Sequence, residues 1–258
     1  MKQFRHPTVP QLEQMHRSLV EGLRSFCMKQ GIHKAVLGLS GGVDSALTLK
    51  IAVDALGSDN VTALMMPEIG LSHTTNIEHS KSLCAFFGVK NYQIAINGLL
   101  QDFNTAPWKP SRLAQMNTKA RVRAVLLYSY ANTENTLVLG TSNKSEILLG
   151  YGTKYGDMAA DVEVIGALLK TEVIALADHV GLPLEIVNKK PSAELAPGQT
   201  DEEDIGAMYI DMDQVLANIE EGEDACLSVG LPDHLVRMVF RRYMASAHKR
   251  EMPPVIGI

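Results

Sequence analysis

The sequence predicts an α/β fold in which helices cover both faces of an open parallel sheet. Four short apolar runs are typical of buried strands, at residues 35–39, 61–66, 92–96 and 136–139. Stretches with helical patterning lie between them, at 43–56, 74–87 and 112–131. Strands that alternate with helices along a chain favour parallel pairing, with the connecting helices packed on the sheet.

The segments on either side of the predicted sheet are expected to be helical. Residues 11–29 carry Met15, Leu19 and Leu23 at helical spacing. After residue 150 the alternation ends, and we expect helices at 168–180, 201–219 and 234–250. A segment rich in proline and glycine, 189–200, is a candidate lid. We therefore expect a single domain, residues 1–258, with a helical C-terminal part.

The composition limits the class of protein. A chain of 258 residues, 46% of them hydrophobic, is large enough to bury one sizeable core. A net charge of -5 argues against a general nucleic-acid-binding protein, which needs an excess of lysine and arginine. Three widely spaced cysteines indicate neither a disulfide framework nor a zinc site, and no apolar stretch suits a membrane span or a signal peptide. We expect a soluble cytoplasmic protein with no nucleic-acid or membrane partner.

A glycine turn, Ser40-Gly41-Gly42-Val43-Asp44-Ser45, directly follows the first predicted strand. Two glycines let backbone N–H groups point into one concavity, and the following helix adds its positive N-terminal end, so the turn suits pyrophosphate. Asp44 would repel a phosphate unless both bind a shared Mg²⁺. The turn matches neither the P-loop nor the dinucleotide-binding motif. For the glycine pair alone, a simple tight turn is the alternative.

The predicted topology places this turn where a ligand would bind. In open parallel sheets, ligands bind at the carboxyl ends of the strands. Ser40, Glu68 and Thr141 each follow a predicted strand within two residues. We therefore expect these three side chains at the same edge of the sheet.

Further motifs carry a resemblance to a known family. They are N-T-K-A-R-V-R at 117–123, G-T-S-N-K-S-E at 140–146, Y-G-T-K-Y-G-D at 151–157, K-P-S-A-E-L at 190–195, G-Q-T-D-E at 198–202 and H-K-R at 248–250. From about residue 11 to the C-terminus, the chain resembles the short, ammonia-dependent NAD synthetases. The glycine turn at 40–45 also belongs to this resemblance, and it is shared by the wider N-type ATP pyrophosphatases. The resemblance implies a Rossmann-like fold of the adenine nucleotide alpha hydrolase kind.

The resemblance also implies a reaction. In this family the nicotinate carboxylate of deamido-NAD attacks the α-phosphorus of ATP, giving an acyl-adenylate and pyrophosphate, and ammonia then displaces AMP to leave NAD. The enzyme is thus a ligase with ATP as co-substrate and Mg²⁺ as cofactor. Both steps depend on holding two anionic nucleotides in line and neutralising the departing charge. The family further implies a homodimer, with deamido-NAD held where two subunits meet.

The resemblance assigns ATP and metal binding to positions that match the family's motifs. The ATP positions are Gly38, Leu39, Ser40, Gly41, Gly42, Val43, Asp44, Ser45, Thr141, Lys170 and Ser192. The Mg²⁺ ligands are Asp44 and Glu146. From the residues alone, Glu146 also suits the first turns of a helix and Thr141 suits a helix cap. Lys170 likewise suits a solvated helix face, and Ser192 a turn.

The remaining assignments concern the acceptor and the chemistry. The positions that match deamido-NAD binding are Arg121, Lys154, Asp161, His248 and Lys249. Asp157 and Lys170 match catalytic positions, and Asp157 is expected to orient ammonia or to take a proton from ammonium. A basic helical face is the alternative for Arg121, and compensation of a helix dipole is the alternative for His248.

One loop departs from the family pattern. The family usually has two glycines after the residue that matches Asp157, whereas this chain has Met158 and Ala159. Their side chains disfavour positive φ, which puts the conformation of the loop and the turnover in doubt.

Other functions are open at this stage. A related N-type pyrophosphatase adenylates a different acceptor, as in GMP-synthetase-like amidation or tRNA thiolation, but paired reactive cysteines and a basic RNA face are not evident. Residues 1–34 are too few for a glutaminase domain before the first strand, so we expect free ammonia as the donor, with a glutaminase on a separate chain left open. A nucleotide sensor without chemistry is the third alternative, although Asp44, Glu146, Asp157 and Lys170 are all present.

Overall fold

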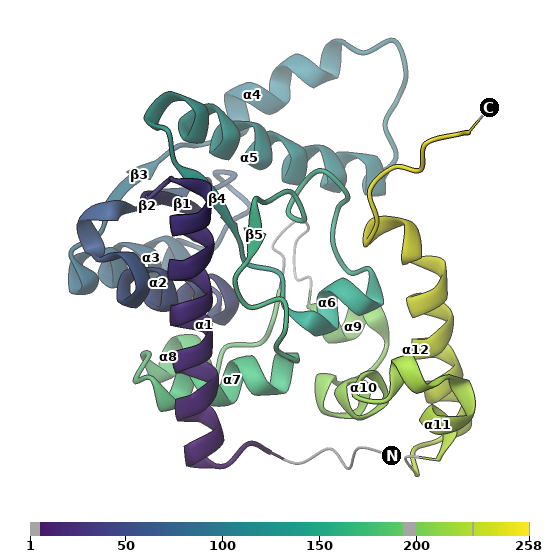
Figure 1. Ribbon diagram of the computed structural model, residues 1–258. Coiled ribbons are helices and arrows are strands. Elements are labelled where there is room, and N and C mark those ends of the chain that lie inside the picture. Colours follow the sequence, from purple (N-terminus) through teal and green to yellow (C-terminus); the bar gives the residue numbers. More distant parts are fainter. Residues whose placement is uncertain (1–5, 193–199, 229, 258) are drawn as a thin grey trace.

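A computed structural model describes residues 6–192, 200–228 and 230–257 and shows an α/β fold (Figure 1). A five-stranded sheet has the order β3-β2-β1-β4-β5, and every neighbouring pair is parallel. The strands are β1 (Ala35–Gly38), β2 (Val61–Met65), β3 (Lys90–Gln93), β4 (Leu137–Gly140) and β5 (Val162–Glu163). The predicted parallel sheet is confirmed.

Alternating side chains explain why both faces of the sheet are covered. Ala35 and Leu37 of β1 pack into one apolar cluster, whereas Val36 between them belongs to a cluster on the opposite face. The first face is covered by α1 (Val9–Gln30), α2 (Val43–Leu56), α3 (Thr74–Phe87), α7 (Lys170–His179) and α8 (Leu184–Val187). The second face is covered by α4 (Asn97–Asp102) and α5 (Arg112–Glu134).

The C-terminal helices form a third apolar cluster beside the carboxyl ends of the strands (Figure 1). Its helices are α6 (Lys144–Leu149), α9 (Asp201–Ile205), α10 (Tyr209–Leu216), α11 (Glu223–Leu227) and α12 (Asp233–Ala245). Met212, Val215 and Val236 are completely buried in it. Because α6 begins just after β4 ends, this helical unit faces the sheet edge where the predicted site lies.

Two strands differ from the prediction. The predicted strand at 92–96 is β3, Lys90–Gln93, and all four of its residues are exposed because it is an edge strand. The apolar signal came from Ile96, which is buried at the start of α4 instead. The fifth strand, β5, has only two residues and was not predicted.

Two predicted helices are shorter than expected. The predicted helix 201–219 is broken at Gly206, whose φ of 91° ends α9 before α10 begins. The predicted helix 234–250 is α12, which ends at Ala245. Short 3₁₀ turns occur at Ser58–Asn60, Phe103–Thr105, Ile219–Glu221 and Ala247–Lys249. Most of the candidate lid, residues 193–199, lies outside the described residues.

None of the described helices is both long and apolar enough to cross a membrane. The cysteines Cys27, Cys84 and Cys226 are buried free thiols.

Candidate active site

The predicted site residues meet in a large cleft at the carboxyl ends of β1, β2 and β4, with a volume of about 730 Å³. The predicted residues that line it are Gly38, Leu39, Ser40, Gly42, Val43, Asp44, Ser45, Arg121, Thr141, Glu146, Lys154, Asp157, Lys170, Ser192, His248 and Lys249. The two that do not line it are Gly41 and Asp161. The cleft thus unites segments from both ends of the sequence.

Hydrogen bonds within the glycine turn fix its shape. Ser45 Oγ accepts the N–H of Ser40 at 3.2 Å and donates to the carbonyl oxygen of Gly42 at 3.1 Å. Gly41 has a φ of 80°, and a Cβ on it would lie 2.5 Å from the carbonyl oxygen of Asn76 in α3. The position therefore requires glycine. The turn leaves the positive N-terminal end of the 14-residue helix α2 facing the cleft.

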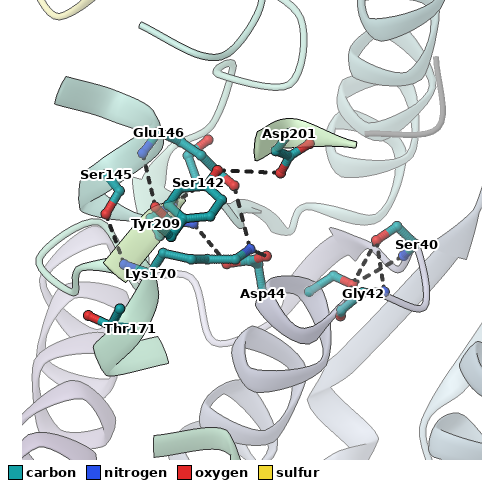
Figure 2. A network of polar contacts seen from close by, with 12 residues as sticks. Ser40, Gly42, Asp44, Ser142, Ser145, Glu146, Lys170, Thr171, Asp201 and Tyr209 are labelled. Atoms are coloured by element: carbon teal, nitrogen blue, oxygen red, sulfur yellow. Dashed lines mark hydrogen bonds and ion pairs between the residues drawn. The ribbon is translucent and has the colours of Figure 1, made fainter. Parts of the chain in front are cut away.

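A buried lysine joins the glycine turn to the C-terminal half of the chain (Figure 2). The Lys170 ammonium forms an ion pair with Asp44 Oδ2, and its Nζ lies 3.8 Å from Glu146 Oε1. Asn143 Nδ2 donates to Asp44 Oδ1 at 2.9 Å, and the N–H of Asn143 donates to Glu146 Oε2 at 3.2 Å. The side chain of Lys170 is only 1% exposed. Asp44, Glu146 and Lys170 therefore form one charged cluster, as expected for residues that were assigned to the same site.

Burial and neighbouring charges set the ionisation of this cluster. Burial raises the pKa of the Glu146 carboxyl well above its ordinary value, and the Asp44 carboxylate raises it further. Burial opposes the charge of the Lys170 ammonium, but the carboxylates of Asp44 and Glu146 outweigh burial and raise its pKa. With both carboxylates ionised, two negative charges face one ammonium. A cation bound here would therefore be stabilised electrostatically.

The cluster fits a Mg²⁺ ion shared with phosphate groups. Mg²⁺ usually binds one or two carboxylates together with water and phosphate oxygens. Asp44 and Glu146 are two such carboxylates, and both line the cleft next to the glycine turn. Within the described ranges, no three His, Cys, Asp or Glu side chains are arranged to hold a metal ion. The metal ligands that this cluster can provide are therefore the carboxylates of Asp44 and Glu146.

Asp201 extends the charged cluster and was not predicted as a site residue. It begins α9, is 4% exposed and lines the cleft. Tyr209 Oη donates to Asp201 Oδ2 at 3.4 Å, and the Tyr209 ring centroid lies 5.5 Å from Lys170 Nζ. Burial raises the pKa of the Asp201 carboxyl, whereas Lys170 lowers it. The G-Q-T-D-E motif contains Asp201, but no local signal shows that α9 returns to Lys170.

Asp157 lies on the cleft wall in the loop between α6 and β5. Its Oδ1 accepts the N–H of Thr153 at 2.9 Å, and Thr153 Oγ1 donates to Asn117 Oδ1 of α5 at 2.9 Å. The carboxylate is open to the cleft, but the surrounding protein atoms remove much of its water and thereby raise its pKa. The loop and α5 together hold this carboxylate in place.

The departure of this loop from the family pattern causes no backbone strain at the substituted positions. The non-glycine residues with positive φ, among those described, are Asn135 and Tyr155. Met158 and Ala159 have φ values that ordinary residues adopt. The doubt raised by the missing glycines is therefore removed as far as the backbone of the loop is concerned.

Three of the residues predicted to bind the acceptor meet at one rim of the cleft. Arg121 Nη2 donates to the carbonyl oxygen of Lys154 at 3.3 Å, and the Lys154 ammonium donates to the carbonyl oxygen of His248. Lys154 Nζ also lies 5.4 Å from the centroid of the Tyr155 ring. We call Arg121, Lys154 and His248 the basic rim.

Lys249 has a different environment from its neighbour His248. Its ammonium donates to the carbonyl oxygens of Gly150 and Gly152, at 2.7 Å and 2.8 Å. Burial lowers the pKa of Lys249, while the Asp157 carboxylate raises it. This side chain therefore holds the start of the loop that carries Asp157.

Asp161 lies apart from the other predicted site residues. Its Oδ2 accepts the N–H of Val138 in β4 at 2.7 Å, and its Oδ1 accepts a hydrogen bond from Tyr128 Oη of α5 at 3.3 Å. The carboxylate thus ties the sheet to α5 outside the cleft lining. Its role in binding deamido-NAD stays a prediction.

Glu163 packs behind the cleft floor and was not predicted. Its Oε2 accepts the N–H of Ser142 at 3.2 Å, and a Cβ on Gly140 would lie 2.1 Å from the same oxygen. The glycine that opens the G-T-S-N-K-S-E motif therefore makes room for this carboxyl. Burial raises the pKa of Glu163 to about 7, although the hydrogen bond from Ser142 lowers it.

Three cationic residues of the cleft were also missed. Lys189 and Lys190 line it beside Ser192, and Arg123 lines it from α5. Arg123 Nε donates to the carbonyl oxygen of Met66 at 3.0 Å, just after β2. Arg123 is one of three cations in the motif at 117–123, which does not show which of them faces a ligand, and Lys190 is the only cation of the motif at 190–195.

Comparisons of the sequence with known proteins give a consistent result. The model of the NAD synthase family matches residues 15–253. The NH(3)-dependent NAD(+) synthetase of Archaeoglobus fulgidus is 43% identical over 246 residues, which are 95% of this chain and 97% of that protein. The enzyme of the same name from Fusobacterium nucleatum is 40% identical over 250 residues, or 96% of each chain.

Solved structures agree with the sequence comparison. The NH3-dependent NAD synthetase of Campylobacter jejuni, in complex with the nitrate ion, has a TM-score of 0.82 at 33% identity and covers 95% of this chain and 99% of that one. The NMN synthetase of Francisella tularensis has a TM-score of 0.85 at 28% identity and covers 96% and 99%.

Gly41→Ala is expected to weaken nucleotide binding. The new Cβ would clash with Asn76, and the positive φ alone costs about 1–2 kcal/mol. If the turn shifts to relieve the clash, the KM for ATP should rise at least about tenfold. Gly57→Ala is a matched control, because Gly57 has a φ of 82° at the other end of α2 and no heavy atom within 4 Å. Equal effects of the two variants on this KM would contradict the prediction.

Glu163→Gln is expected to change how stability depends on pH. Burial raises the pKa of Glu163 from an ordinary value of 4.5 to about 7 in the folded protein, so the folded state binds more protons than the unfolded state in this window. Its contribution to the free energy of unfolding therefore falls as pH rises from about 4.5 to about 7. The free energy of unfolding of Glu163→Gln minus that of wild type should therefore be larger at about pH 8 than at about pH 4.5.

Urea unfolding at the two pH values measures this difference. Glu185→Gln, at an exposed glutamate of α8, is the control and should show no such change. A Glu163→Gln variant with the same pH dependence as wild type would contradict the burial argument.

Proposed function

The chain belongs to the NAD synthase family, and from this membership and its cleft we propose that it amidates deamido-NAD to NAD with ammonia. In the proposed reaction, the nicotinate carboxylate attacks the α-phosphorus of ATP, pyrophosphate leaves, and ammonia displaces AMP. One observation carries this proposal. The glycine turn, Lys170 and Asp157 line the same cleft, so one bound acyl group can meet the groups needed for both steps.

The first step needs phosphate binding and neutralisation of departing charge. The glycine turn and the N-terminal end of α2 would hold the phosphates of ATP. The Lys170 ammonium, which pairs with Asp44 next to the turn, would stabilise the negative charge that develops on pyrophosphate. Asp44 and Glu146 would hold Mg²⁺, which when bound neutralises phosphate charge. Thr141 and Ser192, which also line the cleft, would complete the ATP site.

The second step needs free ammonia next to the acyl-adenylate. Ammonium is the main species at neutral pH, and it has no lone pair for attack until it loses a proton. The raised pKa of Asp157 makes this carboxylate a stronger proton acceptor than an ordinary aspartate. The hydrogen bond from Thr153 orients it. We assign to Asp157 the binding of ammonium and the removal of its proton.

The basic rim supplies the charge that an acceptor dinucleotide requires. The guanidinium of Arg121 and the ammonium of Lys154 suit phosphate and carboxylate groups. His248 joins them from the segment after α12, and Lys249 supports the neighbouring loop. The basic rim lines the same cleft as the glycine turn and Asp157, so an acceptor bound there would share the cleft with both.

We further propose that the chain works as a homodimer. Large apolar side chains are exposed along α4, α5 and the segment between them: Leu99, Phe103, Trp108, Leu113 and Val125. These two helices lie along one side of the molecule (Figure 1). Large apolar side chains exposed on neighbouring elements suit an interaction surface, and symmetric dimers are the commonest oligomers. Arg121 also lies on α5, so the residues that contact the acceptor would lie next to the dimer interface.

Val125→Glu is expected to weaken this dimer at least about tenfold, because it would bury an unpaired carboxylate. Sedimentation velocity over a range of concentrations measures the effect. The control is Phe86→Glu, since Phe86 of α3 is 81% exposed and Val125 is 68% exposed. A dimer disrupted by Phe86→Glu instead would move the interface to α3.

We also propose that the enzyme works in the cytoplasm. Cys27, Cys84 and Cys226 are free thiols, which suits a reducing compartment.

The direct test of the function is NAD formation from deamido-NAD, ATP, Mg²⁺ and ammonium chloride, with AMP and pyrophosphate quantified in parallel. A second tube replaces ammonium by glutamine. A third replaces deamido-NAD by the deamidated form of NMN, because one similar structure is an NMN synthetase. NAD and AMP formed with ammonium would support the proposal. AMP formed only in the third tube would identify a mononucleotide acceptor, and AMP in none would overturn the ligase assignment.

Asp157→Asn is expected to lower NAD formation by about 100-fold or more, because a carboxamide cannot take the proton of ammonium. Pyrophosphate release should change much less, since the glycine turn and Lys170 remain intact. Rapid-quench measurement of the two products separates the steps. Asp178→Asn, an exposed aspartate at the end of α7, is the control. Equal loss of both products would show that Asp157 is not specific to ammonia transfer.

A further inference from the structure

Asp213 of α10 is a completely buried carboxylate that lies outside the cleft lining. Its Oδ1 accepts a hydrogen bond from Ser145 Oγ at 2.5 Å. Its Oδ2 accepts hydrogen bonds from the N–H and the Oγ1 of Thr171, at 2.9 Å and 2.8 Å. Every one of these partners donates, so the ionised carboxylate is the form that this pocket fits.

The partners of Asp213 lie at the starts of two helices. Ser145 is the second residue of α6, and Thr171 is the second residue of α7. The N–H of Lys170 donates to Ser145 Oγ at 2.9 Å, which links the two helix starts directly (Figure 2). One carboxylate thus joins the N-terminal ends of both helices, where negative charge is also favoured by the helix dipoles.

The residues next to these partners belong to the charged cluster. Glu146 follows Ser145, and Lys170 precedes Thr171. The separation of 3.8 Å between Lys170 Nζ and Glu146 Oε1 therefore depends on how α6 and α7 are held. α10 itself is anchored by Met212, which is completely buried. The packing of α10 therefore fixes Asp213, and Asp213 in turn holds the two helices that carry Glu146 and Lys170.

We propose that Asp213 is a positioning residue of the ATP site. It holds the starts of α6 and α7 and thereby fixes Glu146 and Lys170 where they would face the metal ion and the phosphates of ATP. The proposal rests on the proposed function. Residues that orient the groups next to a metal or substrate typically contribute about 10–100-fold to affinity or activity. A purely structural role for Asp213 would lower stability and both substrate affinities together.

The test compares Asp213→Asn with Asp211→Asn, which removes the same charge from the same helix. Calorimetry gives the Kd of MgATP and, separately, of deamido-NAD, and thermal unfolding gives stability. Asp213→Asn should weaken MgATP binding about tenfold or more and leave deamido-NAD binding within about twofold of wild type. Asp211→Asn should change neither. Equal weakening of both ligands, or unchanged MgATP binding, would overturn the proposal.

A second pair of variants decides the matter if Asp213→Asn does not fold. Thr171→Val removes the hydroxyl donor with little change in shape, and Thr171→Ser restores it. MgATP binding should weaken in Thr171→Val and recover in Thr171→Ser. Failure of recovery would contradict the positioning role.

The two proposals fail in distinguishable ways. A wild-type protein that binds MgATP but amidates no acceptor would refute the proposed function, while the MgATP titrations would still decide the role of Asp213.

Discussion

The ion pair between Lys170 and Asp44 is the contact on which the rest of the site depends. Asp44 is the second residue of α2, Lys170 begins α7, and Glu146 lies in the first turn of α6. Three helix N-termini therefore converge on one point, each contributing a positive dipole end to the region where we propose that phosphates bind. The ammonium relieves the repulsion between the two carboxylates without neutralising both.

The fold brings these helix starts together by simple means. The parallel sheet places the ends of β1 and β4 at one edge, with their partner residues in direct register. α2 follows β1, and α6 follows β4, so Asp44 and Glu146 become neighbours although 102 positions separate them. The C-terminal helices then form the opposite wall of the cleft. The cluster is consequently a property of the topology rather than of any single segment.

Much of the fold and the site was predictable from the sequence, for identifiable reasons. Alternating strand and helix patterns predicted the parallel sheet, and the glycine turn predicted the edge of the sheet where the cleft lies. The two-residue strand β5 and the break at Gly206 were missed, because short elements carry little periodicity. Asp201 and Glu163 were missed because their importance arises only from packing. Asp161 is the opposite case: it was assigned to the site, but its motif did not indicate the hydrogen bonds that it accepts from β4 and α5.

The hydrogen bonds of Lys249 carry a consequence for how the enzyme matures. Among the cleft residues, Lys249 is the last to emerge from the ribosome, yet its ammonium holds the carbonyl oxygens at the start of the Asp157 loop. A nascent chain can build the sheet and the glycine turn well before this support exists. In the proposed mechanism, the residues assigned to ATP binding are therefore all synthesised before the lysine that supports the Asp157 loop.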